Sequence, residues 1–438
     1  MNYSSIPETV ANERICLEII EKELVLALGC TEPVAIAYVA ALAKHHSKTG
    51  DIGAIQVAVS GNVIKNAMAV TIPGTMESGV ALAAALGIVA GDHDKKLEVL
   101  AGVTKEQVTQ AKALIAAGLI SVSVAETDKK LYIEVIVRAG DDYAKVVLAD
   151  EHTGVVLIEV DGKIIYQGDS SDNMSAQSQR EDTTLNLDMI WDFVMHVDTE
   201  KLDLVKQSIL LNKQVAMNGL ENAYGMQVGK TLLDGITKGY LPDDLATQAM
   251  ALTAAGSDAR MAGVILPVMS NSGSGNQGLS ATLPVVAVGE KLKVDDEKML
   301  RAVALSHLIT IYIKAKFGRL SALCGAAIAG TGASCGISYL LGGGLTQVKY
   351  AIQNMLGNIT GMLCDGAKAG CAMKVSTCVN AAVQSATLAL AGKCIQATDG
   401  IIETDVEKSI DNLCRLGNQG SLEADRIILD IMLSKQLC

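Results

Sequence analysis

The spacing of hydrophobic and polar residues changes twice along this chain of 438 residues. Apolar residues recur at helical spacing near the start and again from residue 185 onward. Between them lie short β-branched stretches that alternate in polarity and are separated by turns such as Asp161-Gly162. The pattern predicts the α+β class, with four segments: N-terminal helices in 1–50 that pack on the C-terminal domain, a small α+β domain with an antiparallel sheet in 51–168, a linker in 169–184, and a large all-α domain in 185–438.

Two long uncharged stretches in the C-terminal half, residues 261–289 and 320–348, are rich in Gly, Ser and Asn. Residues of this kind interrupt helices and expose backbone polar groups, so the stretches are poor candidates for crossing a lipid bilayer. We expect buried Gly/Ser-rich loops there, lining a site. The N-terminus carries Glu13 and Arg14 where a signal peptide needs a clean apolar run, and we therefore expect a cytoplasmic protein with no membrane partner.

The composition of the chain argues against some classes of function and favours others. The formal net charge is −12 and only 3% of the residues are aromatic, which argues against a nucleic-acid partner. The chain has 10 cysteines, and in a reducing compartment clustered cysteines point to metal binding or catalysis rather than to disulfides. Isolated cysteines are commonly buried core residues, and we expect this of most of the ten.

The cysteines are densest in two segments, residues 323–336 and 357–378, which also contain many small residues. Neither segment has the paired CxxC spacing of a zinc ribbon, and no histidine lies near them. Thiolates dispersed over Gly-rich segments suit an iron–sulfur cluster better. Cys371 and Cys378 are seven residues apart and share one helix face, a spacing that is equally typical of core packing.

Five motifs stand out along the chain: Gly29–Pro33, Ser60–Asn66, Ser257–Met261, Ser270–Gly278 and the segment around Cys364. Together they resemble the L-cysteine desulfidase family, and the resemblance runs from about Cys30 to the region of Cys378. The segment Asn358–Asp365 also resembles the cluster-binding end of the iron–sulfur L-serine dehydratases, where a proline follows the Cys-Asp pair. Here Gly366 follows it, which favours the desulfidase branch.

The resemblance implies a [4Fe–4S] cluster, held by three cysteines with one iron left open, and no pyridoxal phosphate. By position in the motifs the ligands are Cys30, Cys324 and Cys364, with Cys335 and Cys371 as second choices. An open iron can act as a Lewis acid on a leaving thiolate. The implied activity is a carbon–sulfur lyase that converts L-cysteine to pyruvate, ammonia and hydrogen sulfide. An L-serine ammonia-lyase with the same cluster, or a non-catalytic cysteine- or redox-sensing protein, remains an alternative.

The remaining site residues follow from the same motifs and imply a small amino-acid substrate. Backbone N–H groups and polar side chains of a Gly-rich loop can bind a carboxylate. Glu32 and Lys65 are the candidates for the base that removes the α-proton, with Lys368 and Lys374 as alternatives. No role is assigned to a histidine, and the many small residues are compatible with a homodimer. The candidate substrate-binding residues are Asn62, Ser270, Asn271, Ser272, Gly273, Ser274 and Asn276.

Replacing a cluster ligand by alanine is expected to abolish the broad visible absorption of an iron–sulfur protein. The prediction applies separately to Cys30→Ala, Cys324→Ala and Cys364→Ala, each reconstituted anaerobically and measured by absorption spectroscopy. A variant that retains a full cluster removes its residue from the ligand set.

Overall fold

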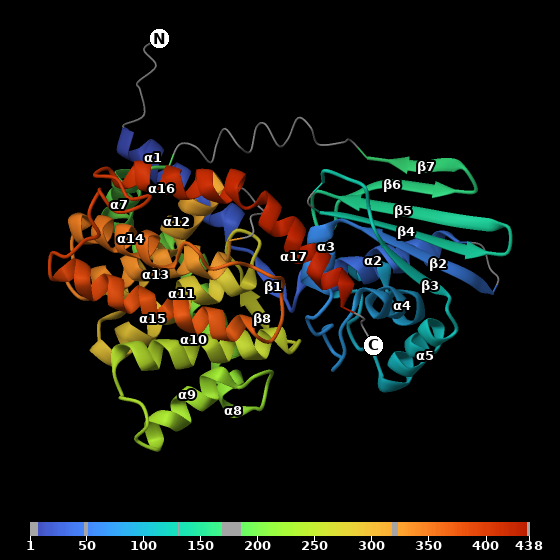
Figure 1. Cartoon of the computed structure of the whole chain (residues 1–438), viewed down its shortest axis with the longest axis horizontal. Coiled ribbons are helices and arrows are strands. Elements are labelled where there is room, and N and C mark those ends of the chain that lie inside the picture. Colours follow the sequence, from blue (N-terminus) through green and yellow to red (C-terminus); the bar gives the residue numbers. More distant parts are fainter. Residues whose placement is uncertain (1–7, 48–50, 130, 169–184, 318–322, 436–438) are drawn as a thin grey trace, which may run out of the picture.

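The computed structural model describes residues 8–47, 51–129, 131–168, 185–317 and 323–435, so the linker expected at 169–184 lies outside the described residues. Two parts lie side by side (Figure 1). The part built from residues 31–168 contains the large sheet and is called the sheet part below. The helical part is built from α1 and from residues 185–435. This arrangement confirms the predicted α+β class.

The sheet part has six strands in the order β3-β2-β4-β5-β6-β7. All neighbouring strands are antiparallel except β2 and β3, which are parallel. The parallel pair arises because α3, α4 and α5 connect β2 to β3, and parallel neighbours need such a long crossover. The strands are β2 (Ile52–Val59), β3 (Ile120–Val124), β4 (Tyr132–Ala139), β5 (Asp142–Ala149), β6 (Val155–Val160) and β7 (Lys163–Gln167).

Helices cover one face of the sheet. Burial alternates along β4, where Ile133, Val135 and Val137 are fully buried and pack in one core with the apolar residues of α2 and α4. The alternation of apolar and polar residues that predicted the strands therefore also determines which face of the sheet packs against the helices. The helices of this part are α2 (Thr31–His46), α3 (Gly61–Ala67), α4 (Val80–Ala90), the 3₁₀ segment η1 (His93–Glu98) and α5 (Lys105–Ala116).

The helical part surrounds α13, which packs against α11, α12, α14 and α15. Its elements are α1 (Glu8–Glu23), α7 (Leu187–His196), η3 (Thr199–Lys201), α8 (Asp203–Glu221), α9 (Val228–Thr237), α10 (Leu245–Met261), α11 (Gly275–Leu292), α12 (Asp296–Phe317), α13 (Gly325–Leu340), α14 (Leu345–Ile359), α15 (Cys371–Leu390), α16 (Val406–Arg415), η4 (Leu416–Gly420) and α17 (Leu422–Ser434), with a small two-stranded sheet of β1 (Leu26–Leu28) and β8 (Pro267–Met269).

Most of the two Gly- and Ser-rich stretches is helical. They form α11 and α13, and the buried loop that the sequence predicted is confined to residues 262–274, where Ser270 and Asn271 are buried. The glycines of α13 serve close packing: a Cβ at Gly332 would lie 2.3 Å from the Ser306 carbonyl oxygen, and one at Gly336 would lie 2.6 Å from that of Ala302. Small residues therefore bring α13 against α12 instead of ending it.

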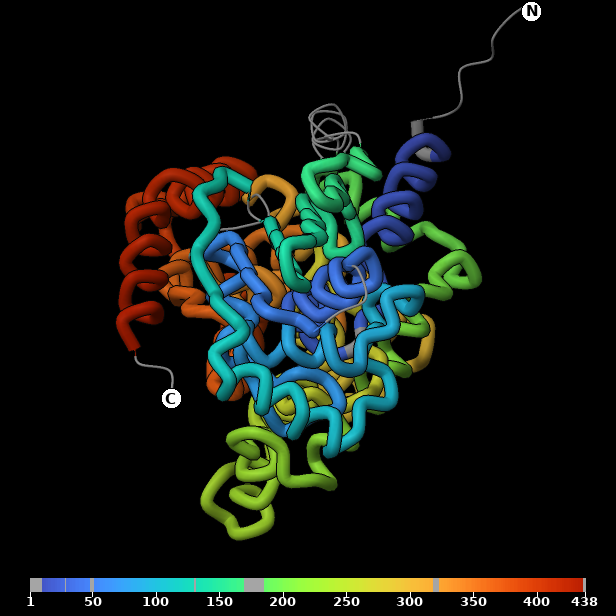
Figure 2. Tube along the Cα trace, turned by 90° about the vertical axis from the view of Figure 1, so that its right-hand side faces the viewer, coloured from blue at the N-terminus to red at the C-terminus, as the bar shows by residue number. Residues whose placement is uncertain are grey.

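The first fifty residues divide between the two parts. Cys16 and Ile20 of α1 belong to the core of the helical part, whereas α2 is buried in the core of the sheet part. At the other end of the chain, α17 reaches back to α3, where Leu429 packs beside Gly61 (Figure 1). Figure 2 shows α1 and α17 on opposite sides of the molecule. No helix within the described ranges is both long and apolar enough to span a membrane.

The packing of α2 against α4 leads to a prediction about Gly87. A Cβ there would lie 2.2 Å from the Ala37 carbonyl oxygen, so Gly87→Ala should force the two helices apart and lower the free energy of unfolding by about 1–3 kcal/mol. Urea denaturation measures this. Gly361→Ala is the control, because nothing lies within 4 Å of its Cβ position. Equal stability of the two variants would contradict the packing argument.

Candidate functional site

Segments from both parts of the molecule meet in one buried cluster at their junction. Cys30 at the start of α2, Val70 after α3 and Met261 at the end of α10 are buried together, and Ala367 and Cys371 pack against them. Residues from both ends of the chain thus share one apolar environment. This cluster is called the junction below.

Two glycines allow the backbones to approach each other there. Gly366 has φ +91°, and a Cβ on it would lie 2.0 Å from the Lys65 carbonyl oxygen. Gly29 has φ +63°, and its Cβ would lie 2.5 Å from Pro73 Cγ. Both positions combine a left-handed backbone with a lack of space, so any side chain there would displace the loops that carry Cys30 and Cys371.

Three thiols gather on one side of the junction. Cys324 precedes α13, Cys364 lies in the loop after α14, and Cys371 begins α15. The Cys324 N–H donates to the Met362 carbonyl at 2.8 Å, next to a β-bridge between Leu323 and Leu363, and this ties the two loops together.

The three thiols lie close enough to influence one another's ionisation. Burial raises the pKa of Cys324, the neighbouring Cys364 and Cys371 add to the rise, and the resulting pKa is about 11. Burial also raises the pKa of Cys371, as does Cys364. Mutual repulsion of this kind means that the thiolates would be stabilised together only by nearby positive charge.

Lysines supply such charge. Lys368 and Lys374 both form ion pairs with Asp365, and Lys374 also donates to the Leu363 carbonyl at 2.7 Å. Burial raises the pKa of Asp365, but the two lysines outweigh it and lower the pKa to about 2. Burial lowers the pKa of Lys374, whereas Asp365, Cys324 and Cys364 raise it, and the net shift is upward.

Cys30 has a different set of neighbours. Its thiol donates to a Glu32 carboxylate oxygen at 3.2 Å. Burial raises its pKa well above the usual value, Glu32 adds to the rise, and the nearby Arg260 opposes it. Cys371 thus packs against the cluster that contains Cys30, but the charged groups that act on the Cys30 thiol are the Glu32 carboxylate and the Arg260 guanidinium.

The cysteines at and beside the junction are the donors available for the expected cluster. Within the described ranges there is no group of three or more His, Cys, Asp or Glu side chains arranged to hold a metal ion. A four-iron cluster is wider than a single ion, however, and its usual ligands are cysteine thiolates. A thiol-only donor set with a lysine beside it fits such a cluster in its chemistry. None of the cysteines that the structure describes forms a disulfide.

The other cysteines in these segments are packed in the helical core. Cys335 is fully buried in the middle of α13, where its thiol donates to the Thr331 carbonyl at 3.3 Å. Cys378 is also fully buried, but it lies close enough to Cys324 for that thiol to add to the rise in its pKa that burial causes. The structure thus separates Cys335 from the junction and leaves Cys371 in it.

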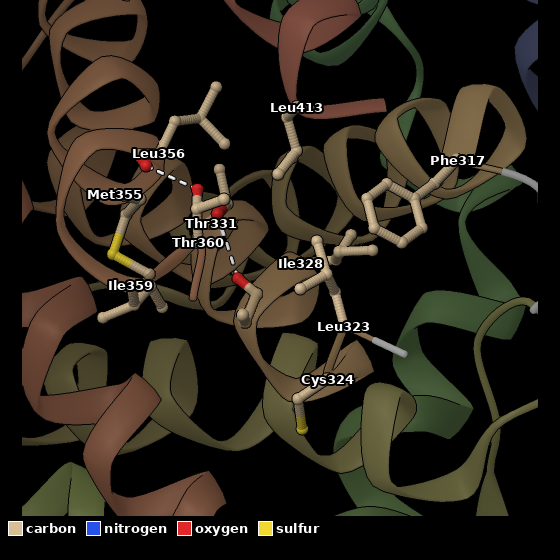
Figure 3. A pocket seen from close by; sticks show the side chains of 11 residues that line it. Phe317, Leu323, Cys324, Ile328, Thr331, Met355, Leu356, Ile359, Thr360 and Leu413 are labelled. Carbon is tan, nitrogen blue, oxygen red and sulfur yellow. Dashed lines mark hydrogen bonds between the residues drawn. The ribbon is translucent and has the colours of Figure 1, made fainter. Parts of the chain in front are cut away.

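An apolar pocket lies beside Cys324 (Figure 3). Phe317, Ile328 and Leu356 contribute to its lining, and the Cys324 sulfur points away from them in Figure 3. Cys324 lines this pocket and belongs to the same helical core, and the mostly apolar lining offers few polar groups to a charged amino acid.

The candidate bases differ in their surroundings. Lys65 is buried, and its Nζ donates to Asp425 Oδ1 of α17 at 2.5 Å. Glu32 accepts hydrogen bonds from Cys30 and Thr31. Asn62 lies in the first turn of α3, one turn before Lys65. Of these residues, Glu32 has the shortest connection to a thiol of the junction.

The predicted carboxylate loop has a largely structural role. Ser270 donates to the Val25 carbonyl at 2.6 Å, Asn271 contacts the buried His307, Ser272 donates to Asn271, and Ser274 caps α11. Gly273 is exposed. Asn276 differs, since its Nδ2 donates to the sulfur of Met261 at 3.6 Å and so reaches the junction.

Arg260 is a candidate that the sequence analysis missed. It lies in the last turn of α10, is 7% exposed, and donates from Nη2 to the Gly29 carbonyl at 3.1 Å. The only available signal was its place in the motif Ser257–Met261, because a lone arginine in a helix is usually solvated.

Comparison with known proteins identifies the family. A family model described as serine dehydratase alpha chain matches residues 94–430, more than half of the chain. The chain belongs to the serine dehydratase alpha chain family. This confirms the more distant of the two resemblances, that to serine dehydratases.

Relatives cover nearly the full length. The chain is 48% identical over 421 residues to a UPF0597 protein of Oleidesulfovibrio alaskensis, with 96% of this chain and 98% of the relative covered. It is 42% identical over 435 residues to a UPF0597 protein of Porphyromonas gingivalis, covering 98% and 100%. A UPF0597 protein of Bacteroides thetaiotaomicron is 44% identical over 426 residues, covering 96% and 98%.

Asp258, two residues before Arg260, gives a prediction for pH dependence. It is 1% exposed and accepts the Gly229 N–H at 3.1 Å, while its Oδ1 has no hydrogen-bond partner. Burial raises its pKa to about 6, although backbone N–H groups at the start of α9 oppose the rise. The folded chain therefore favours the protonated acid, and this contribution to stability is lost as the pH rises from about 4 to about 6.

Asp258→Asn keeps the acceptor and removes the ionisation. The stability of the variant relative to the unmodified protein should rise between about pH 4 and pH 6 and stay constant above it, as measured by urea unfolding. The exposed Asp234→Asn serves as the control on α9. A difference between the two proteins that is independent of pH would contradict the prediction.

Proposed function

We propose that this chain is an iron–sulfur-dependent lyase that eliminates sulfide from L-cysteine and yields pyruvate, ammonia and hydrogen sulfide. Its membership of a family of dehydratase-like lyases supports the elimination chemistry. The convergence of thiols at the junction supports a cluster as the cofactor. The reaction needs a binding site for the carboxylate, a base for the α-proton and a group that accepts the leaving sulfur.

Cys324 and Cys364 are two of the proposed ligands, as the motifs implied. For the third, Cys371 is better placed than Cys30, because Cys371 interacts with both other thiols whereas Cys30 interacts with Glu32 and Arg260. A cluster bound by these cysteines would supply a Lewis acid for the leaving group.

The chain's own residues would supply the rest. Lys374 lies beside Cys324 and Cys364, where its charge offsets that of thiolates. Glu32 is hydrogen-bonded to Cys30, so the two form a pair that can hold or pass a proton at the junction. Lys65, the other candidate base, is held in its ion pair with Asp425 and would first have to leave it.

The observation that carries the choice of cysteine over serine is the backbone at Gly366. The serine dehydratases that the sequence resembles have proline after the Cys-Asp pair, and proline requires φ near −65°. Gly366 has φ +91° and lies against the Lys65 carbonyl, a conformation that proline cannot adopt. The loop after Cys364 therefore differs in shape from the serine dehydratase pattern, which supports a different leaving group.

L-Serine ammonia-lyase activity is the second candidate. The description of the matching family supports it, because that description names serine dehydratase. The same thiols and the same carboxylate recognition would serve either substrate, since cysteine and serine differ only in the leaving atom.

Anaerobic reconstitution followed by incubation with L-cysteine and with L-serine tests the proposal. Release of sulfide and pyruvate from cysteine at a higher kcat/KM than pyruvate from serine is the expected result. Pyruvate from serine alone would support the second candidate. Tight cysteine binding without turnover would overturn both and indicate a sensor.

Two variants sharpen this test. Cys371→Ala should lose the cluster absorption and all turnover. The sequence motifs implied that Cys30→Ala also loses the absorption; with Cys371 as the third ligand, Cys30→Ala should instead keep it and lose turnover. Cys335→Ala is the matched control, as this thiol is buried away from the junction. Loss of the absorption in Cys30→Ala with its retention in Cys371→Ala would restore Cys30 as the ligand.

A further inference from the structure

We propose that Arg260 binds the carboxylate of the substrate and thereby restricts the site to small thiols or alcohols that carry a carboxylate. The inference rests on the proposed function and deepens it. It assigns carboxylate recognition to a buried guanidinium at the junction instead of to the Gly-rich loop at residues 270–278.

The first argument is that Arg260 is buried without a counter-ion. It is 7% exposed, and no acidic side chain in the described ranges lies within ion-pair distance of it. Among the described residues its guanidinium forms one hydrogen bond, from Nη2 to the Gly29 carbonyl, and its Nε is buried with no partner. Buried charges are normally paired, because desolvation of an isolated ion is costly.

The neighbouring buried cation shows the usual arrangement. Lys65 is 5% exposed and contacts Asp425 at 2.5 Å. At Arg260 the protein supplies only a neutral carbonyl. An anionic ligand that binds there would complete the pairing, and the planar guanidinium matches a carboxylate through two parallel hydrogen bonds.

The second argument is position. Arg260 is close enough to Cys30 to oppose the rise in the pKa of that thiol, and Met261, the next residue, packs with Cys30 in the junction. A carboxylate held by Arg260 would therefore lie beside the thiols. In a small amino acid only two bonds separate the carboxyl carbon from the carbon that bears the leaving group.

The third argument is that the chain makes room for the guanidinium. A Cβ on Gly275 would lie 2.2 Å from Arg260 Nε and 2.7 Å from its Cζ. Gly275 begins α11 without a positive φ, so its lack of a side chain there reflects space and not backbone strain. Asn276, the following residue, donates from Nδ2 to the sulfur of Met261, so a second polar group lies next to the residue that follows Arg260.

A purely structural role for Arg260 makes a different prediction. If the arginine only binds the Gly29 carbonyl or moderates the charge at Cys30, its loss should weaken all ligands alike. If it binds the carboxylate, its loss should weaken only ligands that carry one. The nearby Glu32 does not alter this distinction, because its carboxylate already accepts hydrogen bonds from Cys30 and Thr31.

The test uses 3-mercaptopropionate and its methyl ester, which share the thiol and the carbon chain but differ at the carboxyl group, which is charged in the acid and neutral and methylated in the ester. Calorimetric titration of the anaerobically reconstituted full chain should give roughly tenfold or tighter binding of the acid over the ester. Arg260→Gln should abolish this preference by weakening the acid alone, and Arg260→Lys should retain part of it.

A second variant guards against misfolding of Arg260→Gln. Gly275→Ala leaves the arginine in the sequence but displaces its guanidinium, and it should reduce the preference for the acid in the same way. Arg301→Gln is the control, because Arg301 is a partly buried arginine that donates to the Val194 carbonyl and pairs with Glu297 on α12.

The outcomes separate this inference from the proposed function. Equal weakening of acid and ester in Arg260→Gln, or an unmodified protein without preference, would overturn the role of Arg260. Preference for the acid that depends on Arg260, in a chain that turns over neither cysteine nor serine, would support the carboxylate site and overturn the proposed lyase.

Discussion

The close approach of Gly366 to the Lys65 carbonyl is the contact on which the site depends. It joins the loop that carries Cys364 and Cys371 to α3, which follows β2 of the large sheet, and it exists only because Gly366 has no Cβ. The side chain of the same Lys65 forms an ion pair with Asp425, and this contact attaches α17. Lys65 thus connects α3, the thiol loop and α17.

Burial gives this junction its chemistry. Thiols away from water have raised pKa values, and those values fall only when cations or a metal compensate for the charge. Lys374 on one side and Arg260 on the other provide positive charge within a largely apolar environment. The two cations differ in one respect: Lys374 is paired with Asp365, whereas Arg260 is left for an anion that the chain does not supply.

Local patterns predicted much of the fold. The alternation in β4 and the helical spacing after residue 185 are properties of neighbouring residues, and both elements formed as expected. The glycines of α13 were harder to interpret, because glycine both ends helices and lets them pack closely, and only the position of α12 decides between these roles. The same is true of α2, whose apolar residues could cover either the sheet or the helical core.

The sequence by itself determined the fold class, the two cysteine-rich segments and the family resemblance, because these depend on residue type and on short-range spacing. Tertiary structure decided which thiols lie together, since Cys335 and Cys371 have similar surroundings in sequence but one is in a helix core and the other at a junction. It also decided that Arg260 is buried with no counter-ion among the residues that the structure describes. The charge balance of a site depends on residues that are distant along the chain, so it cannot be predicted from the spacing of residues that are close in sequence.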